Sequence, residues 1–180
     1  MLFGIQGHIY WKDSEISTKL SPCLEIKSVV LNSFIHTVFE INLGEKENLK
    51  IPEIIKFNKE LLRSYLPGLY DSDGTLPKEP DKTKDLFIDI TMKDLCFIAE
   101  IKECLLLFGI ETLKIYNRKH KSPSSEFISS TFEIRIRKIG MLIRFLQEIG
   151  FKHPNKALRE EKMLKLLKRA RWDLNPRPSP

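Results

Sequence analysis

One nine-residue segment, Leu66–Gly74, constrains this chain more than any other part of its sequence. It closes a stretch in which apolar residues recur at helical spacing. Asn58 predicts the start of this helix and Asp73-Gly74 predicts its end, so we expect a helix from about residue 59 to 72. Asp71 and Asp73 place negative charge at the C-terminal end of the helix, where it opposes the helix dipole. A positive group should compensate them, and a divalent cation is the simplest candidate.

The same helix carries small residues along one side. Ser64, Gly68 and Ser72 recur at every fourth position and therefore form a stripe that a second helix can approach closely. Two such helices side by side would bring two Asp-containing ends together. Pro67 lies in mid-helix, removes one backbone hydrogen bond and should bend the helix.

The following residues alternate between strand and helix patterns. Strand patterns cover residues 86–90, 113–118 and 132–137. Helix patterns cover residues 94–108, 139–149 and 156–170, and Gly109 and Gly150 end the first two. From Asn58 we interpret these patterns as the order helix, strand, strand, helix, strand, strand, helix, which holds one strand more than the three strand patterns and one helix fewer than the four helix segments. This order indicates an α+β fold with an antiparallel sheet.

This arrangement resembles the LAGLIDADG family of homing endonucleases, whose αββαββα unit carries a saddle-like sheet. The resemblance covers about residues 51–167, with Leu66–Gly74 as the signature and Ile149–Lys156 as a further match. It implies a site-specific endonuclease that hydrolyses double-stranded DNA with Mg²⁺ or another divalent cation and moves an intron or intein. By the same resemblance, Asp73 holds the metal, and Asp73 and Lys156 are catalytic. The helix interface would comprise Ser64, Gly68, Asp71 and Ser72.

Charge is distributed unevenly along the chain. Residues 1–111 hold 13 Lys and Arg against 18 Asp and Glu, whereas residues 112–172 hold 16 against 5. A basic block that spans strand and helix patterns fits a polyanion-binding face, with a membrane surface or plain solubility as the alternatives. The candidate DNA-binding side chains are Lys114, Tyr116, Arg118, Arg135, Arg137 and Lys152.

Residues 1–50 resemble a truncated, degenerate copy of the same unit. Strand-like segments near residues 7–10 and 24–26 precede a helical segment at 32–43, and Met1–Gln6 would be the remnant of a motif helix. The charged stretch Glu45–Lys50 marks the boundary with the domain at 51–170. Residues 171–180 hold three prolines near the end and are expected to be disordered past about Trp172.

Several classes of protein are excluded or left as alternatives. The three cysteines form no CxxC pair, which excludes a zinc ribbon, and no apolar run is long enough to span a membrane. We expect an intracellular, cytoplasmic protein, and since each chain supplies one Asp73, double-strand cleavage needs a homodimer. The alternatives are a non-cleaving nucleic-acid binder, such as a maturase or regulator, and a decayed remnant of a two-motif enzyme. Asp73 favours the enzyme, whereas Pro67 and the shortened first half favour the binder.

Overall fold

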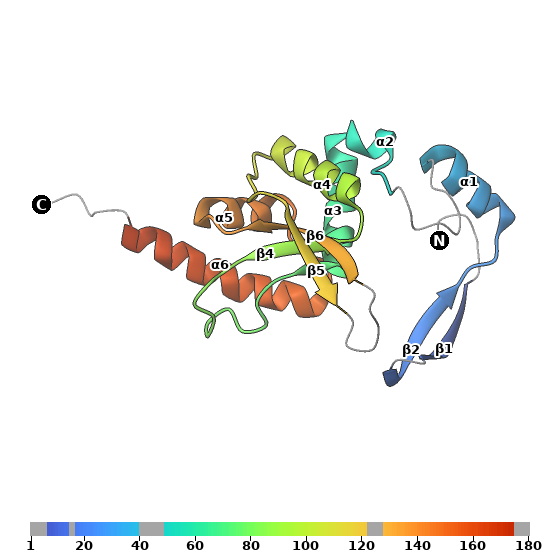
Figure 1. The fold of residues 1–180 in the computed structure, drawn as a ribbon, viewed down its shortest axis with the longest axis horizontal. Coiled ribbons are helices and arrows are strands. Elements are labelled where there is room, and N and C mark those ends of the chain that lie inside the picture. Colours follow the sequence, from blue (N-terminus) through green and yellow to red (C-terminus); the bar gives the residue numbers. More distant parts are fainter. Residues whose placement is uncertain (1–6, 15–16, 40–48, 122–127, 175–180) are drawn as a thin grey trace, which may run out of the picture. The chain divides into compact units, whose positions relative to one another are not determined.

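The computed structural model describes residues 7–14, 17–39, 49–121 and 128–174 (Figure 1). The chain divides into two units, Met1–Glu45 and Lys46–Pro180. The division falls at the start of the charged stretch that the sequence marks as a boundary. Each unit is described separately below.

The second unit combines helices with one antiparallel sheet, as the sequence predicts. Its helices are α2 (Glu53–Lys56), α3 (Lys59–Ser72), α4 (Leu95–Leu107), α5 (Ile139–Glu148) and α6 (Pro154–Leu174). Its strands are β3 (Gly74–Thr75), β4 (Ile88–Met92), β5 (Tyr116–Lys121) and β6 (Ile128–Ile136). The strands lie in the order β3-β4-β6-β5, so β4 and β6 are central and every neighbouring pair is antiparallel. The predicted α+β fold is thereby confirmed.

Local signals set the helix ends. The side chain of Asn58 accepts hydrogen bonds from the backbone N–H groups of Glu60 and Leu61, so α3 starts where the sequence predicts. Asp94 caps α4 in the same way by accepting from Phe97 N at 3.1 Å. Gly109 and Gly150 follow α4 and α5 with φ angles of 67° and 65°, a backbone conformation that side chains with a Cβ rarely adopt.

The strand boundaries differ from the predicted ones. β4 starts two residues later than the pattern suggests, β5 covers 116–121 in place of 113–118, and β6 begins at Ile128. β5 and β6 pair as a hairpin that extends to Lys121 and Ile128. Backbone pairing therefore continues beyond the residues whose apolar pattern reveals the core, and residues 119–121, which follow the predicted strand, belong to β5.

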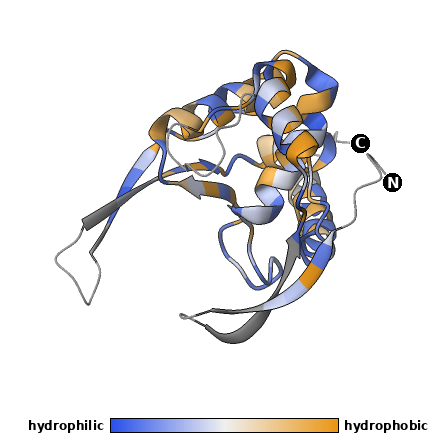
Figure 2. Ribbon diagram, turned by 90° about the vertical axis from the view of Figure 1, so that its right-hand side faces the viewer, coloured by the Kyte–Doolittle hydropathy of each residue, from blue (hydrophilic) through white to orange (hydrophobic). Residues whose placement is uncertain are grey.

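The two faces of the sheet differ in chemistry. Ile88 and Ile90 of β4 and Ile134 and Ile136 of β6 are buried, in one core with apolar residues of α3, α4, α5 and α6. Polar and apolar segments accordingly follow one another along the helices (Figure 2). Because side chains alternate along a strand, the residues between these isoleucines point to the opposite face, called the outer face below.

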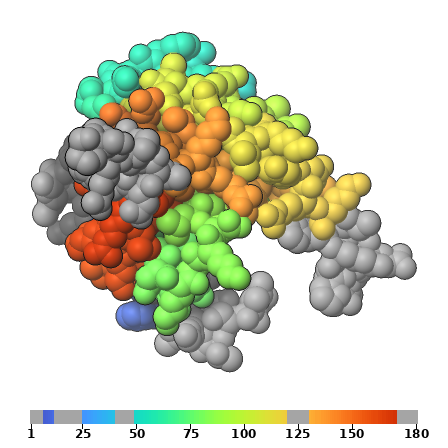
Figure 3. Space-filling view, turned by 90° about the vertical axis from the view of Figure 1, so that its left-hand side faces the viewer, coloured from blue at the N-terminus to red at the C-terminus, as the bar shows by residue number. Residues whose placement is uncertain are grey.

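Helix α6 extends from Pro154 to Leu174, longer than the predicted 156–170. A proline suits the first helical position, because the N–H that it lacks would have no partner within the helix. Figure 3 shows the surface of α6 beside α5 and the connection between β3 and β4. Residues 175–180 of the predicted tail lie outside the described residues. Within the described ranges, no helix has the length and apolar character needed to cross a membrane.

The first unit holds β1 (His8–Ser14), β2 (Ser17–Glu25) and α1 (Val29–Phe39). The two strands pair antiparallel, with His8 opposite Glu25. None of the residues of α1 is buried, and Val29 is 82% exposed. The order strand, strand, helix is also that of β3, β4 and α4. Descent from a degenerate copy stays a prediction, and its proposed motif remnant, Met1–Gln6, lies outside the described residues.

Candidate functional site

The C-terminal end of α3 is held by a lysine from α6. The Nζ atom of Lys156 donates hydrogen bonds to the carbonyl oxygens of Tyr70, Asp71 and Gly74 at 2.8, 2.7 and 2.6 Å. An ammonium group has three donors, so these bonds use all of them. The compensating positive charge that the sequence calls for is therefore a side chain of the protein itself. Burial lowers the pKa of Lys156, and the carboxylates of Asp71 and Asp73 oppose that shift.

Asp71 makes the opposite connection, from α3 to the start of α6. Its Oδ2 atom accepts from the backbone N–H groups of Lys152 and His153 at 3.0 and 2.9 Å. These two residues lie immediately before Pro154, the first residue of α6, where backbone N–H groups lack helical partners. α3 and α6 therefore cap each other reciprocally, with a carboxylate at one helix start and an ammonium at the other helix end.

A second carboxylate braces the same turn. Oε2 of Glu160 accepts from Phe151 N at 2.8 Å, and burial raises the pKa of this carboxyl against the opposing effect of that hydrogen bond. The rings of Tyr70, Phe145 and Phe151 pack together beneath, with the Tyr70 and Phe145 centroids 4.7 Å apart. The end of α3 is thus fixed by both polar and aromatic contacts.

Asp73, at the same helix end, forms no side-chain bond to another helix within the described ranges, unlike Asp71. Its side chain is exposed, and its Oδ2 atom lies 2.7 Å from the hydroxyl of Ser72, which also lies 2.9 Å from Leu69 O. Asp73 is the C-cap residue, and its own backbone N–H bonds back into α3. Of the two motif carboxylates, Asp71 bonds to the start of α6 through Oδ2, and Asp73 faces solvent.

Gly74 follows Asp73 and is required by close packing. A Cβ at this position would lie 2.6 Å from both a ring carbon and the carbonyl oxygen of Tyr70. Gly68, six residues earlier, has the opposite surroundings, because a Cβ there would meet no atom within 4 Å. Close packing therefore explains the glycine at position 74 but not the one at position 68.

The exposed side of α3 carries the predicted stripe. Ser64, Gly68 and Ser72 are all exposed, and the hydroxyl of Ser64 bonds to Glu60 O within the helix. Two apolar side chains, Phe57 and Leu61, are exposed just before and at the start of the same helix. The stripe is thus solvent-facing, as two-helix packing would require.

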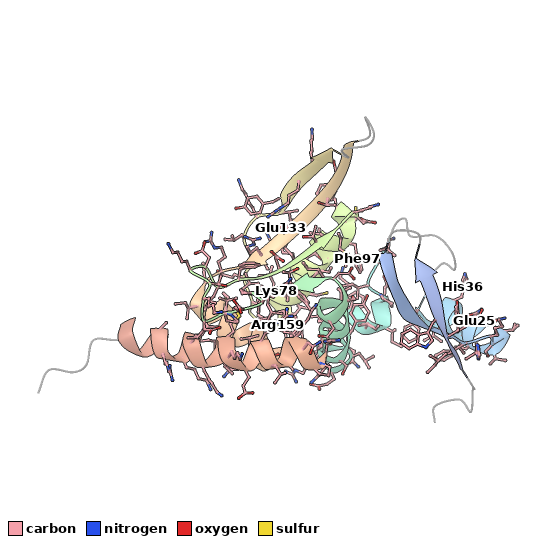
Figure 4. All side chains as sticks on the ribbon, turned by 90° about the horizontal axis from the view of Figure 1, so that it is seen from below. Glu25, His36, Lys78, Phe97, Glu133 and Arg159 are labelled. Atoms are coloured by element: carbon pink, nitrogen blue, oxygen red, sulfur yellow. The ribbon has the colours of Figure 1, made fainter. Side chains whose placement is uncertain are left out.

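A chain of four charged side chains crosses the outer face of the sheet. Arg135 bonds through Nε and Nη2 to Asp89 Oδ2, and its Nη2 also lies 3.1 Å from Glu133 Oε1. The other oxygen of Glu133, Oε2, lies 2.7 Å from Nη2 of Arg118. Asp89 and Arg135 are cross-strand neighbours on β4 and β6. We call Asp89, Arg135, Glu133 and Arg118 the outer-face network; Figure 4 labels Glu133 within it.

The remaining predicted DNA-binding residues lie around this network. The ammonium of Lys114 lies 5.5 Å from the ring centre of exposed Tyr116, which is opposite Glu133. Arg137 forms an exposed ion pair with Asp85 at 2.8 Å. Lys152 belongs to the α5–α6 turn, where its backbone N–H bonds to Asp71 and its ammonium charge acts to lower the pKa of Glu160. Three arginines of the expected basic face are thus paired with carboxylates, namely Arg118, Arg135 and Arg137.

Sequence reasoning missed Asp89 and Glu133 as members of the site. Each lies between two apolar strand residues, which marks a polar position on the face opposite the core. The identity of the partner arginines depends on strand register, which pattern alone does not give. Burial raises the pKa of the Asp89 carboxyl, and its bonds to Arg135 act against that shift.

Comparison with protein families assigns the chain. Residues 60–150, half of the chain and including α3 through α5, match the family model described as a LAGLIDADG-like domain. The chain therefore belongs to the LAGLIDADG-like domain family, and the resemblance carried by Leu66–Gly74 is confirmed.

Two further similarities extend beyond the matched domain. The chain is 29% identical over 168 residues to glutamine–fructose-6-phosphate aminotransferase of Methanocaldococcus jannaschii, an alignment that covers 93% of this chain but 14% of that protein. Among solved structures, it is similar to I-DmoI in complex with DNA and Mn, with a TM-score of 0.49 and 16% identity. That alignment covers 83% of this chain and 66% of the other.

Proposed function

We propose that this chain is an endonuclease that hydrolyses double-stranded DNA at a specific site with a divalent metal ion. The observation that carries the proposal is that the charged residues at the end of α3 differ in their contacts. Asp71 and Lys156 satisfy the backbone groups of the two helix ends, whereas Asp73 is exposed. Membership of the LAGLIDADG-like family supports reading this carboxylate as the reactive one.

Asp73 fits the way in which Mg²⁺ is usually held. This ion takes one or two carboxylates and completes its shell with water and substrate phosphates. The described residues contain no group of three or more His, Cys, Asp or Glu side chains that could hold an ion alone. Asp73 would therefore share the ion with DNA phosphates and water. A bound cation would supply an activated water and stabilise charge on the leaving oxygen.

The enzyme would act as a homodimer that packs through α3. An interior glycine costs a helix up to about 1 kcal/mol relative to alanine, and a Cβ at Gly68 would meet no other part of the described chain within 4 Å. A second α3 crossing at Gly68, flanked by Ser64 and Ser72, would explain the small residues and cover Leu61. Such a dimer would place one Asp73 near each DNA strand. Gly68→Leu should then yield a monomer in sedimentation, and an unchanged dimer would place the interface elsewhere.

DNA would lie on the outer face of the sheet. Tyr116, Arg118 and Arg135 project from this face, and Lys114, Arg137 and Lys152 would add contacts at its margins. Hydrogen bonds from such side chains to base edges would give sequence preference, and lysines on phosphates would give affinity. We propose an intracellular site of action, at the DNA site into which the intron or intein that encodes the protein inserts.

A second candidate function is favoured by Lys156. Its ammonium group is fully engaged by three carbonyl oxygens, so the lysine that the family resemblance makes catalytic is not free in this structure. Pro67 within α3 is a further departure from what the family resemblance implies for this helix. A DNA-binding protein without cleavage, such as a maturase or regulator, would need neither a free catalytic lysine nor a motif helix without proline.

A cleavage assay separates the two candidates. The purified chain is incubated with plasmids that carry the DNA flanking its own coding sequence, with Mg²⁺, with Mn²⁺ or with EDTA. The proposal predicts linear product with metal only, its loss in Asp73→Asn, and its retention in Asp81→Asn, which changes another exposed carboxylate. Binding without cleavage would favour the non-cleaving binder. Cleavage that survives Asp73→Asn would remove Asp73 from the active site.

A further inference from the structure

The outer-face network alternates in charge, and its four members neutralise one another. The order is Asp89, Arg135, Glu133, Arg118, with closest contacts of 2.7, 3.1 and 2.7 Å. Two carboxylates and two guanidinium groups give the network no net charge. A sheet face that looks basic in sequence is therefore nearly neutral where these residues meet.

Burial within the network is graded. The side chains of Glu133 and Asp89 are 5% and 8% exposed, whereas those of Arg135 and Arg118 are 25% and 50% exposed. The carboxylates therefore lie beneath, and the guanidinium groups cover them toward solvent. Arg135 is further fixed by Phe87, whose ring centre lies 4.3 Å from its Cζ atom.

These acids are not needed to build the core. The apolar core lies on the opposite face of β4 and β6, and a desolvated ion pair is seldom more stabilising than apolar residues of similar size. What the acids do change is the field on the face and the freedom of the arginines. Both properties matter to a protein that must distinguish one DNA sequence from many.

We propose that Asp89 and Glu133 are specificity-determining residues, which withhold Arg135 and Arg118 from DNA phosphates and present their guanidinium groups to base edges. This inference rests on the proposed DNA binding. Sequence-independent affinity comes from cations on phosphates, each of which adds about −0.9 to the slope of log affinity against log salt. An arginine neutralised by a buried carboxylate contributes little to that term. A guanidinium held in place loses less entropy when it bonds to the O6 and N7 atoms of a guanine.

The test removes one buried charge without changing the shape of the side chain. Glu133→Gln releases Arg118, the more exposed arginine of the two, to contact a phosphate. For a random-sequence duplex the salt slope should steepen by about 0.9 per protomer on the DNA, which is about eightfold in affinity at roughly 0.1 M salt. Selection from a random duplex library should return a weaker sequence preference than the wild type does.

Glu148→Gln is the matched control. Glu148 also pairs with an arginine, Arg63, at 2.7 Å, but it lies on α5 and bonds to α3. It should leave the salt slope and the sequence preference unchanged. The double variant Glu133→Gln/Arg118→Gln should return the slope for random duplex to the wild-type value, because the released cation is gone, while the sequence preference stays weak.

The outcomes separate this inference from the function on which it rests. A wild-type protein that binds DNA, together with a folded Glu133→Gln variant of the same slope and preference, would overturn the inference alone. A wild-type protein that binds no duplex at any salt concentration would overturn the proposed function as well. If Glu133→Gln fails to fold, Arg118→Gln in the otherwise unchanged chain should weaken sequence preference more than Arg137→Gln, and equal effects would overturn the inference.

Discussion

Charged residues serve different ends in two regions of the second unit. At the junction of α3 and α6, Asp71 and Lys156 bond to backbone groups of the other helix and fix its position. On the outer face, Asp89, Arg135, Glu133 and Arg118 bond to one another's side chains. At the junction, the charged side chains bond to backbone groups that would otherwise lack partners. On the outer face the charges neutralise one another, and the bonds found among the described residues join these side chains to other side chains only.

The difference indicates which residues are available for chemistry. A charge that satisfies buried backbone groups is structural, and its removal should cost stability. A charge that pairs with a side chain near solvent can exchange its partner for a ligand. Asp73 belongs to neither group, because it lies at the junction and yet leaves its carboxylate exposed.

The largest effect is expected at Lys156. Lys156→Met keeps the apolar stem but leaves three carbonyl oxygens without a charged donor, and we expect the free energy of unfolding to fall by about 3 kcal/mol. Urea unfolding followed by circular dichroism measures this loss. Lys162→Met, at an exposed position of the same helix, should be nearly neutral. Equal stabilities of the two variants would show that the junction does not depend on the lysine.

Alanine substitutions at Gly68, within α3, and at Gly74, just after it, should change the free energy of unfolding in opposite directions. Gly74→Ala forces a Cβ against the Tyr70 carbonyl and should cost about 2 kcal/mol. Gly68→Ala meets open space and should raise the stability of the isolated monomer by about 0.5–1 kcal/mol through helix propensity. Urea unfolding at protein concentrations below the dissociation constant of the proposed dimer measures both changes. A loss at Gly68 in the monomer would mean that the helix needs this glycine for its own packing.

Local signals made α3 and the helix ends predictable, whereas long-range pairing did not follow from sequence. Asn58, Gly109 and Gly150 act on their own neighbours, so their effects can be read from the sequence. Lys156 reaches carbonyl groups more than 80 positions away, which no local pattern reveals. The resemblance singled out Lys156 but assigned it to chemistry, while the structure uses it as a cap. The pairing of Arg135 with Asp89 likewise follows from register across two strands.

The smallest effect on stability is expected on the outer face. Arg118→Met removes one ion pair of a half-exposed side chain, and the buried Glu133 keeps Arg135 as a charged partner at 3.1 Å, so the free energy of unfolding should change by only about 0.5 kcal/mol. The same urea titration measures the free energy of unfolding of Arg118→Met for comparison with that of Lys156→Met. A loss as large as that of Lys156→Met would mean that the network holds the sheet together, and the distinction between the two regions would disappear.

The most direct test of the account compares the two motif carboxylates as alanine variants. Asp71→Ala should lose about 2 kcal/mol of unfolding free energy, because two backbone N–H groups at the start of α6 lose their acceptor. Asp73→Ala should unfold within about 0.5 kcal/mol of the wild type and still bind duplex DNA, but show no metal-dependent cleavage. The reverse result, with Asp73→Ala unstable and Asp71→Ala stable but inactive, would contradict the assignment of structure to Asp71 and chemistry to Asp73.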